Sequence, residues 1–327
     1  MITRRTFLAA TAGAAAAAAS ATTAWAQSVS GRPIRLIVPF PAGGATDAFA
    51  RAISQKLGEK LGASVIVDNR PGAGGAIGSD MAAKAAPDGD TLLLATSSTH
   101  SIGPSFASAS KLPYDAATDF TPIAHLGDAP NIVLVPNSSP AKTMKEWVEY
   151  ARKNPGKLNY GSSGNGTIVH VSTEYLLSMA NLNLVHIPYR GTGLSIPDLA
   201  SGKLDLLVDS LTSGLPHVRG GRLRGLAITS LKRSPLVPDL PPVADSIPGY
   251  EAITWFGLYG PKNLPPALVS RINTAVNQVL HDKDVVEAFG RLGIEPAGGT
   301  PQQFAAMVEA DRAKWKKIIN DRKITNE

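Results

Sequence analysis

The chain has 327 residues and a formal net charge of +6, with 43% hydrophobic and only 6% aromatic residues. It contains no cysteine, which excludes disulfides, thiolate metal sites and cysteine nucleophiles. Its basic residues are scattered rather than gathered in a stripe, so we expect no nucleic-acid surface. The length is sufficient for two lobes, each with its own hydrophobic core.

Residues 1–26 have the pattern of an export signal. Arg4 and Arg5 precede an alanine-rich apolar run that ends at Ala24-Trp25-Ala26, a small-x-small cleavage pattern. We expect cleavage after Ala26 and a periplasmic mature protein. The paired arginines favour twin-arginine export, with general secretory export as the alternative. The run is weakly apolar, which disfavours a retained membrane anchor.

The next elements alternate between strands and helices. Short apolar strands at 35–38, 65–67 and 92–94 are each followed by a loop rich in Gly, Ser, Thr or Pro. Phe49, Ile53 and Leu57 then repeat every four residues, which indicates one face of a helix. Such alternation predicts a mainly parallel sheet with helices on both faces.

The same alternation restarts in the middle of the chain. It predicts a helix over 144–153, a second helix from 167 to about 179, and strands at 132–135, 158–160, 184–187, 204–208 and 226–228. Two helical segments, 266–280 and one that carries Phe304 to Ile319, complete the chain. We therefore predict an α/β protein whose first lobe comprises 27–128 and 253–327 and whose second lobe comprises 129–252. Ligands of such sheets lie beyond the carboxyl ends of the strands, which places the site between the lobes.

Two glycine-rich loops stand directly before predicted helices. They are Gly43-Gly44 and Gly164-Asn165-Gly166-Thr167. The first turn of a helix leaves backbone N–H groups unpaired and carries partial positive charge, and glycine lets a ligand approach closely. Two such helix ends facing one cleft would bind a carboxylate or a phosphate without requiring an arginine.

The motifs of several other site types are absent. The loop 161–167 has no lysine after Gly166, so it is not a phosphate loop, and no dinucleotide fingerprint, Gly-x-Ser-x-Gly elbow or His-Glu-x-x-His motif occurs. We expect no metal, no cofactor and no enzymatic activity. The enzymatic alternative is a secreted hydrolase that uses Ser162 or Ser163 with His170.

Several single polar residues near these loops allow both a structural and a ligand-binding interpretation. Asp47 either favours its helix N-terminus, or it orients the ligand loop or binds a ligand amine. His170 is either a packing or hydrogen-bonding residue or a ligand-binding one. Asp209 follows an apolar strand, where it could hold a neighbouring loop or a ligand hydroxyl. Tyr189 and Arg190 could stack on and pair with an anion, or Arg190 could point to solvent.

Several motifs resemble one family along essentially the whole mature chain. They are 35–44 with Asp47 and Arg51, 69–75, 160–167 with His170, 186–191 and 225–229. These runs resemble the Bug-type periplasmic receptors, the substrate-binding components of tripartite tricarboxylate transporters. Two departures are Asp209-Ser210-Leu211, where the family often has Asn or another polar residue after the Asp, and 241–246, which lacks the usual Glu near Asp245.

The resemblance implies a two-lobed periplasmic-binding-protein fold of type II, the Venus flytrap. It also implies a ligand carboxylate held mainly by backbone amides and waters, with 40–44 as one half of the clamp and 162–167 as the other. We expect a monomer that delivers a small carboxylate to a membrane permease, or, alternatively, reports it to a sensor kinase. Citrate, dicarboxylates, acidic amino acids, nicotinate and aromatic carboxylates all remain open. The predicted ligand-binding residues are Phe40, Ala42, Gly43, Gly44, Asp47, Thr96, Ser97, Ser162, Ser163, Gly164, Asn165, Gly166, Thr167, His170, Tyr189, Arg190, Gly191 and Asp209.

Overall fold

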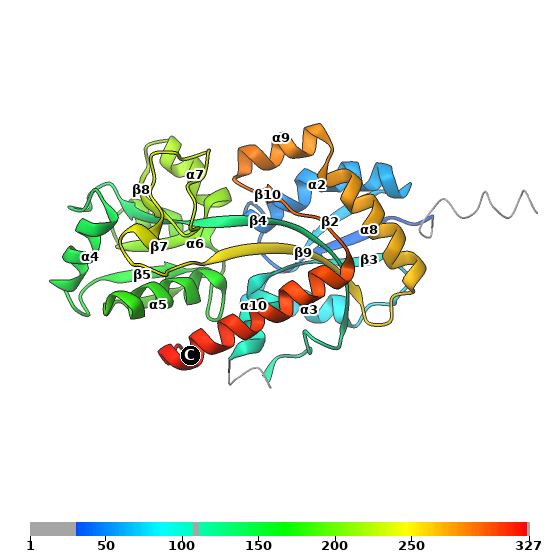
Figure 1. Cartoon of the computed structure of the whole chain (residues 1–327), viewed down its shortest axis with the longest axis horizontal. Coiled ribbons are helices and arrows are strands. Elements are labelled where there is room, and N and C mark those ends of the chain that lie inside the picture. Colours follow the sequence, from blue (N-terminus) through cyan, green and yellow to red (C-terminus); the bar gives the residue numbers. More distant parts are fainter. Residues whose placement is uncertain (1–30, 107–110, 326–327) are drawn as a thin grey trace, which may run out of the picture.

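The computed structural model describes residues 31–106 and 111–325 and shows two α/β lobes side by side (Figure 1). Strands of both lobes follow one path in the order β2-β1-β3-β9-β4-β7-β5-β6, and β8 and β10 also pair with β4. The predicted fold class is confirmed. The proposed signal at 1–26 lies outside the described residues.

The first lobe has a sheet with helices on both faces. Leu92 and Leu94 of one strand point into one hydrophobic cluster, while Leu93 and Ala95 point into another. Alternate residues of a strand face opposite sides of a sheet, so a fully apolar run indicates a sheet covered twice. The elements are β1 (Ile34–Val38), β2 (Val65–Asn69), β3 (Thr91–Thr96), β9 (Ile253–Pro261) and β10 (Glu295–Pro296), with α2 (Ala45–Leu61), α8 (Pro266–Leu280) and α9 (Lys283–Leu292) on one face, and α3 (Ala76–Ala83) and part of α10 (Pro301–Arg322) on the other.

The second lobe repeats this plan with shorter strands. Its strand β5 lies between β6 and β7 and runs parallel to both. Helices surround the sheet, and their buried residues join one large cluster with the strands. The elements are β5 (Asn159–Ser162), β6 (Val185–Pro188), β7 (Leu206–Ser210) and β8 (Leu223–Ile228), with α4 (Met144–Arg152), α5 (Ile168–Ala180), α6 (Thr192–Ala200) and α7 (Leu211–Arg219).

One long strand links the lobes. β4 (Phe120–Pro136) has 17 residues, of which those up to Pro130 pair with β9 and those from Asn131 on pair with β7 and β8. These pairings are antiparallel, so each sheet is mixed, although β1 to β3 and β5 to β7 have the expected parallel arrangement. The apolar run 132–135 indicated only the last part of β4. Pro122 and Pro130 interrupt the pattern of the earlier part.

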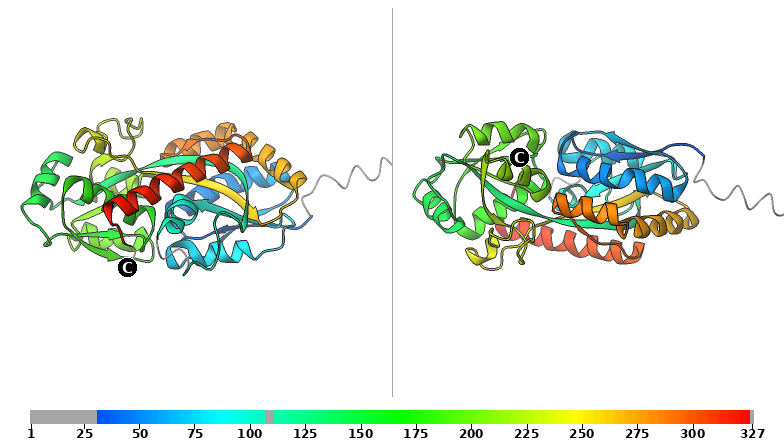
Figure 2. Two further views of the ribbon diagram at one scale, coloured as in Figure 1. Left: turned by 60° about the horizontal axis from the view of Figure 1, so that its bottom comes forward. Right: turned by 90° about the horizontal axis from the view of Figure 1, so that it is seen from above.

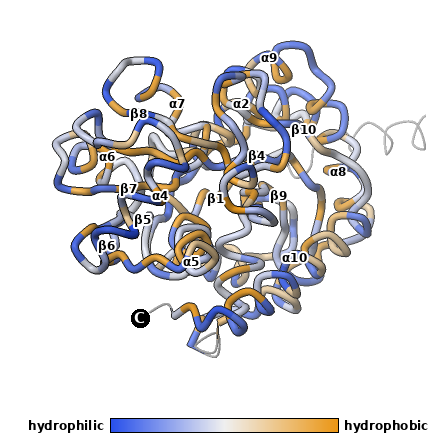
Figure 3. The backbone as a smooth tube through the Cα atoms, turned by 60° about the vertical axis from the view of Figure 1, so that its left-hand side comes forward, coloured by the Kyte–Doolittle hydropathy of each residue, from blue (hydrophilic) through white to orange (hydrophobic). Residues whose placement is uncertain are grey.

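The C-terminal helix α10 contacts both lobes. Phe304 and Val308 belong to a first-lobe cluster, whereas Trp315 and Ile319 belong to the second-lobe cluster. Figure 2 shows α10 running along both lobes. In Figure 3, hydrophobic and hydrophilic stretches alternate along α10. The contacts of α10 connect the two lobes in a way that the sequence pattern did not indicate. The limits of the lobes remain a prediction. No helix within the described ranges is long and apolar enough to cross a membrane.

Candidate functional site

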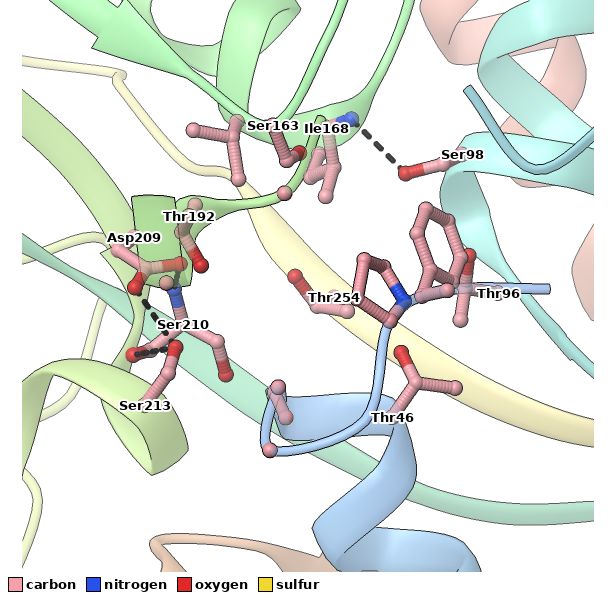
Figure 4. A pocket seen from close by; sticks show the side chains of 18 of the residues that line it. Thr46, Thr96, Ser98, Ser163, Ile168, Thr192, Asp209, Ser210, Ser213 and Thr254 are labelled. Atoms are coloured by element: carbon pink, nitrogen blue, oxygen red, sulfur yellow. Dashed lines mark hydrogen bonds between the residues drawn. The ribbon is translucent and has the colours of Figure 1, made fainter. Parts of the chain in front are cut away.

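A cavity of about 460 Å³, here called the first cavity, lies between the lobes (Figure 4). The first lobe contributes the loop after β1, the start of α2 and Thr96 at the end of β3. The second lobe contributes Ser163, residues 191–194 and the start of α7, and Asn131 and Thr254 come from β4 and β9. The cavity therefore occupies the place expected for a ligand of α/β sheets, beyond the carboxyl ends of strands.

The N-terminus of α2 opens into this cavity. Gly44 is its N-cap and, having no side chain, makes no side-chain hydrogen bond to the first turn. Ala45 and Thr46, the first helical residues, both line the cavity. The first amides of a helix have no partner within it, so this end offers N–H donors and partial positive charge to an anion.

Asp47 supports the loop from behind. Its Oδ2 atom accepts hydrogen bonds from the Gly43 amide at 2.9 Å and from Arg51 Nε at 3.0 Å. Burial by itself raises the pKa of Asp47, but hydrogen bonds from Arg51, Gly43 and Asn69 hold that pKa below its usual value. Asp47 therefore orients the loop, which is one of its predicted roles. Asp47 does not line the first cavity. The Gly43 amide is occupied by its hydrogen bond to Asp47.

The N-terminus of α5 is largely closed by side chains, which differs from the sequence-based expectation, although Ile168 and Val169 of its first turn line the first cavity. Thr167 is its N-cap and accepts from the His170 amide at 3.4 Å. The Gly166 amide donates to His170 Nδ1 at 3.2 Å. The Ile168 amide donates at 2.9 Å to Ser98 Oγ, which comes from the first lobe (Figure 4). Threonine is a preferred N-cap residue, and Thr167 fills this role within the loop that the sequence pattern predicts to be open.

Two other helices present open N-termini to the first cavity. Gly191, with a φ of +112°, is the N-cap of α6, and Ser210 is the N-cap of α7. Neither cap makes a side-chain hydrogen bond to its helix. The sequence pattern did not identify these helices, which carry Pro197 and Pro216 in their interiors. The short glycine motif at 191–193 was the available signal for α6.

Asp209 lies between these two helix ends. It is 2% exposed and accepts hydrogen bonds from the Ser210 amide at 2.8 Å and from Ser213 Oγ at 2.7 Å (Figure 4). Burial raises the pKa of Asp209 to about 6, and the hydrogen bonds from Ser213, Ser210 and Thr192 oppose the rise. A group with this pKa can change its protonation state near neutral pH.

Unpaired hydroxyl groups add to the polar lining. Thr96 Oγ1 and Ser210 Oγ are buried and have no hydrogen-bond partner among the described residues. Both residues line the first cavity. Buried polar atoms in proteins are almost always paired, so these two point to a polar ligand.

Half of the predicted residues line the first cavity. These are Phe40, Ala42, Gly43, Gly44, Thr96, Ser163, Arg190, Gly191 and Asp209. The others do not line it, and they are Asp47, Ser97, Ser162, Gly164, Asn165, Gly166, Thr167, His170 and Tyr189. Sequence reasoning missed several polar lining residues, which come from the start of α2, the segment after β3, strands β4, β7 and β9, and the unrecognised helices α6 and α7: Thr46, Ser98, Asn131, Thr192, Ser210, Ser213 and Thr254.

Neither Ser162 nor Ser163 forms the pair with His170 that the hydrolase alternative requires. Ser162 Oγ contacts His186 Nε2 at 2.6 Å, but Ser162 is fully buried and does not line the first cavity. Ser163 Oγ donates to Thr167 Oγ1 at 3.0 Å. Burial lowers the pKa of His170 to about 3 and that of His186 to about 4, so both rings are neutral. In the described ranges, no group of three or more His, Cys, Asp or Glu residues could hold a metal ion.

The two-lobed fold and the polar cavity between strand ends define a solute-binding protein. Residues 49–324 match the model of the tripartite tricarboxylate transporter family receptor, and the chain belongs to this family.

Individual relatives are similar to this chain along nearly its whole length. A Pseudomonas sp. (strain P51) protein, the UPF0065 protein in the tcbD-tcbE intergenic region, is 41% identical over 88% of this chain and 85% of its own length. The structure of R. palustris Rpa4515 with adipate is 35% identical and covers 90% of this chain and 98% of that one, with a TM-score of 0.86. MatC from Rhodopseudomonas palustris with bound malate is 30% identical over 88% of this chain and 99% of that one, with a TM-score of 0.83.

Proposed function

We propose that the protein is an exported receptor that captures a small carboxylate in the first cavity and delivers it to a membrane permease. The observation that carries this proposal is the meeting of three helix N-termini without side-chain caps, those of α2, α6 and α7, at one cavity. Backbone amides and helix dipoles directed at one point favour an anion. The similar proteins solved with adipate and malate support a carboxylate.

The size and the polarity of the cavity fit such a ligand. Its volume of about 460 Å³ is in the usual range for small-molecule sites. A hydrogen bond to a charged group contributes about 1.5–3 kcal/mol, and micromolar binding needs about 8 kcal/mol. Two or three amide contacts, together with the hydroxyl groups, therefore suffice for micromolar affinity.

Thermal unfolding in a series of ligands tests this function. A ligand that binds only the folded state at 100 times its dissociation constant stabilises that state by about 2.7 kcal/mol. We expect C2 to C8 mono- and dicarboxylates to include compounds that raise the unfolding temperature, and their neutral amides to leave it unchanged. No shift with any carboxylate, or equal shifts with the amides, would refute the proposal.

A further inference from the structure

The first cavity has a polar end in each lobe. Thr96 and the start of α2 line its first-lobe side, and Ser210 and the starts of α6 and α7 line its second-lobe side. Figure 4 shows Thr96 and Ser210 on opposite sides of the space. Thr96 is 2% exposed and Ser210 is 5% exposed, and the hydroxyl oxygen of each has no partner among the described residues. Because buried hydroxyl groups are almost always paired, a ligand with a polar group at both ends fits this cavity better than a ligand with one.

Asp209 lies at the second-lobe end without a cation beside it. The uncapped starts of α6 and α7 favour an anion there, but an ionised Asp209 is itself an anion. Its two carboxyl oxygens accept from the Ser210 amide and from Ser213 Oγ. Burial and three hydrogen bonds set the pKa of Asp209 at about 6, and no charged side chain of the described residues contributes to it.

The other charged groups around Asp209 have surroundings of their own. Arg190 is the second charged residue that lines the first cavity, and it is exposed to solvent. The part of β4 that pairs with β7 carries no titratable residue. On the helices and strands packed around β7 and α7, the titratable groups are bound elsewhere: Asp47 to Arg51, Tyr160 to Glu174, His170 to the Gly166 amide, Asp198 to Tyr189, His217 to Arg222, and Arg219 to the Leu236 carbonyl.

Two carboxylates that lie close together in a buried site do not both stay ionised, so one of them takes up a proton. We propose that the second-lobe end of the first cavity binds the second carboxylate of a dicarboxylate, and that Asp209 takes up one proton from solvent when this group enters. The protonated carboxyl of Asp209 then has an O–H donor for the ligand, while the first carboxylate lies at the start of α2. This inference rests on the proposed function. Asp209 thereby distinguishes dicarboxylates from monocarboxylates, and the distinction depends on pH.

Isothermal titration calorimetry in two buffers with different ionisation enthalpies counts this proton. The ligands are the linear C4 to C8 dicarboxylates and the monocarboxylates of the same lengths. A group with a pKa of about 6 is only about one-tenth protonated at pH 7, so we expect uptake of about 0.9 proton per bound dicarboxylate and less than about 0.3 per monocarboxylate. From pH 6.5 to pH 8, the affinity for the dicarboxylate should fall about twentyfold, and that for the monocarboxylate should stay within about twofold.

Asp209→Asn replaces the carboxyl group by a neutral group of the same shape. Its side-chain oxygen can still accept from the Ser210 amide, and Ser213 Oγ has a second acceptor in the Ser210 carbonyl oxygen at 3.2 Å. This variant should bind the same dicarboxylate without proton uptake and with an affinity that does not change from pH 6.5 to pH 8. Asp205→Asn is the matched control, since burial also raises the pKa of Asp205, which precedes β7 and does not line the first cavity. It should keep the full proton uptake.

The outcomes separate the two proposals. Dicarboxylate binding with less than about 0.3 proton, or proton uptake that survives Asp209→Asn, overturns the role of Asp209 and leaves carboxylate capture intact. Binding of monocarboxylates alone also overturns it, because the second-lobe end would then take no second acid group. If no carboxylate of the series binds, the proposed function fails and this inference fails with it.

Discussion

The two glycine-rich loops before α2 and α5 are similar in sequence and different in use. The loop that ends at Gly44 leaves its helix end open to the first cavity. At the loop that ends at Thr167, the amides of Gly166, Ile168 and His170 donate to His170, Ser98 and Thr167, respectively. We therefore expect a glycine-rich loop to serve as an anion site only where the first-turn amides have no side-chain partners.

The largest effect is expected at the open loop. Gly44 has ordinary backbone angles, φ −83° and ψ 174°, and a Cβ atom there would be 3.5 Å from the Pro41 carbonyl oxygen, so Gly44→Asp can fold. The new carboxylate would cap α2 and occupy the anion position. We expect an unchanged unfolding temperature and about a 1,000-fold loss of carboxylate affinity, since two charged hydrogen bonds are lost.

Thr143→Asp is the control for this substitution. Thr143 is the exposed N-cap of α4 and does not line the first cavity, so the change adds the same charge at a helix start elsewhere. Its calorimetric affinity should equal that of the unmodified protein. If Gly44→Asp retains affinity within about threefold, the α2 end is not the anion site.

The next largest effect concerns the pH dependence of stability at Asp209. Its folded-state pKa of about 6 lies above the ordinary value of 3.8, so the folded state holds a proton that the unfolded state loses between these values. Stability should therefore fall as pH rises from about 4 to about 6, by about 2–3 kcal/mol. Asp209→Asn should abolish this loss. Urea unfolding at pH 4 and pH 7 measures the difference, and parallel curves for the two proteins would contradict it.

A smaller effect is expected at the closed loop. Thr167→Ala removes the N-cap of α5 and should lower the free energy of unfolding by about 1–2 kcal/mol. Carboxylate affinity should change by less than about threefold, because Thr167 does not line the first cavity. Thr300→Ala, at the exposed N-cap of α10, provides a comparison for cap loss alone. A large loss of affinity without a loss of stability would mean that the closed loop contacts the ligand.

The smallest effect is expected for the bond between the lobes. Ser98→Ala removes the acceptor of the Ile168 amide and should cost about 1 kcal/mol, measured by urea unfolding. Since Ser98 also lines the first cavity, affinity is measured in parallel. An unchanged free energy of unfolding would show that this hydrogen bond between the lobes contributes nothing to stability.

Several features of the fold followed from local sequence patterns. Strands β1 and β3, helices α2, α4, α5 and α8, and the loops at the strand ends are visible because hydrophobic periodicity and glycine act over a few neighbouring residues. Because these signals are local, a single residue can hide a helix. Pro197 in α6 and Pro216 in α7 disturb the hydrophobic pattern, so these helices were hard to recognise.

The sequence by itself determined that two α/β units carry glycine-rich loops at their strand ends, and it identified Gly44 at the open end of α2. Only the tertiary structure decided which helix ends remain open. Ser98 and Ile168 are separated by 70 positions, and the hydrogen bond between them exists only because the two lobes meet. The partner of a helix-end amide is set by such distant contacts, which no local pattern encodes. That is why the closed end of α5 and the open ends of α6 and α7 became apparent only in the folded molecule.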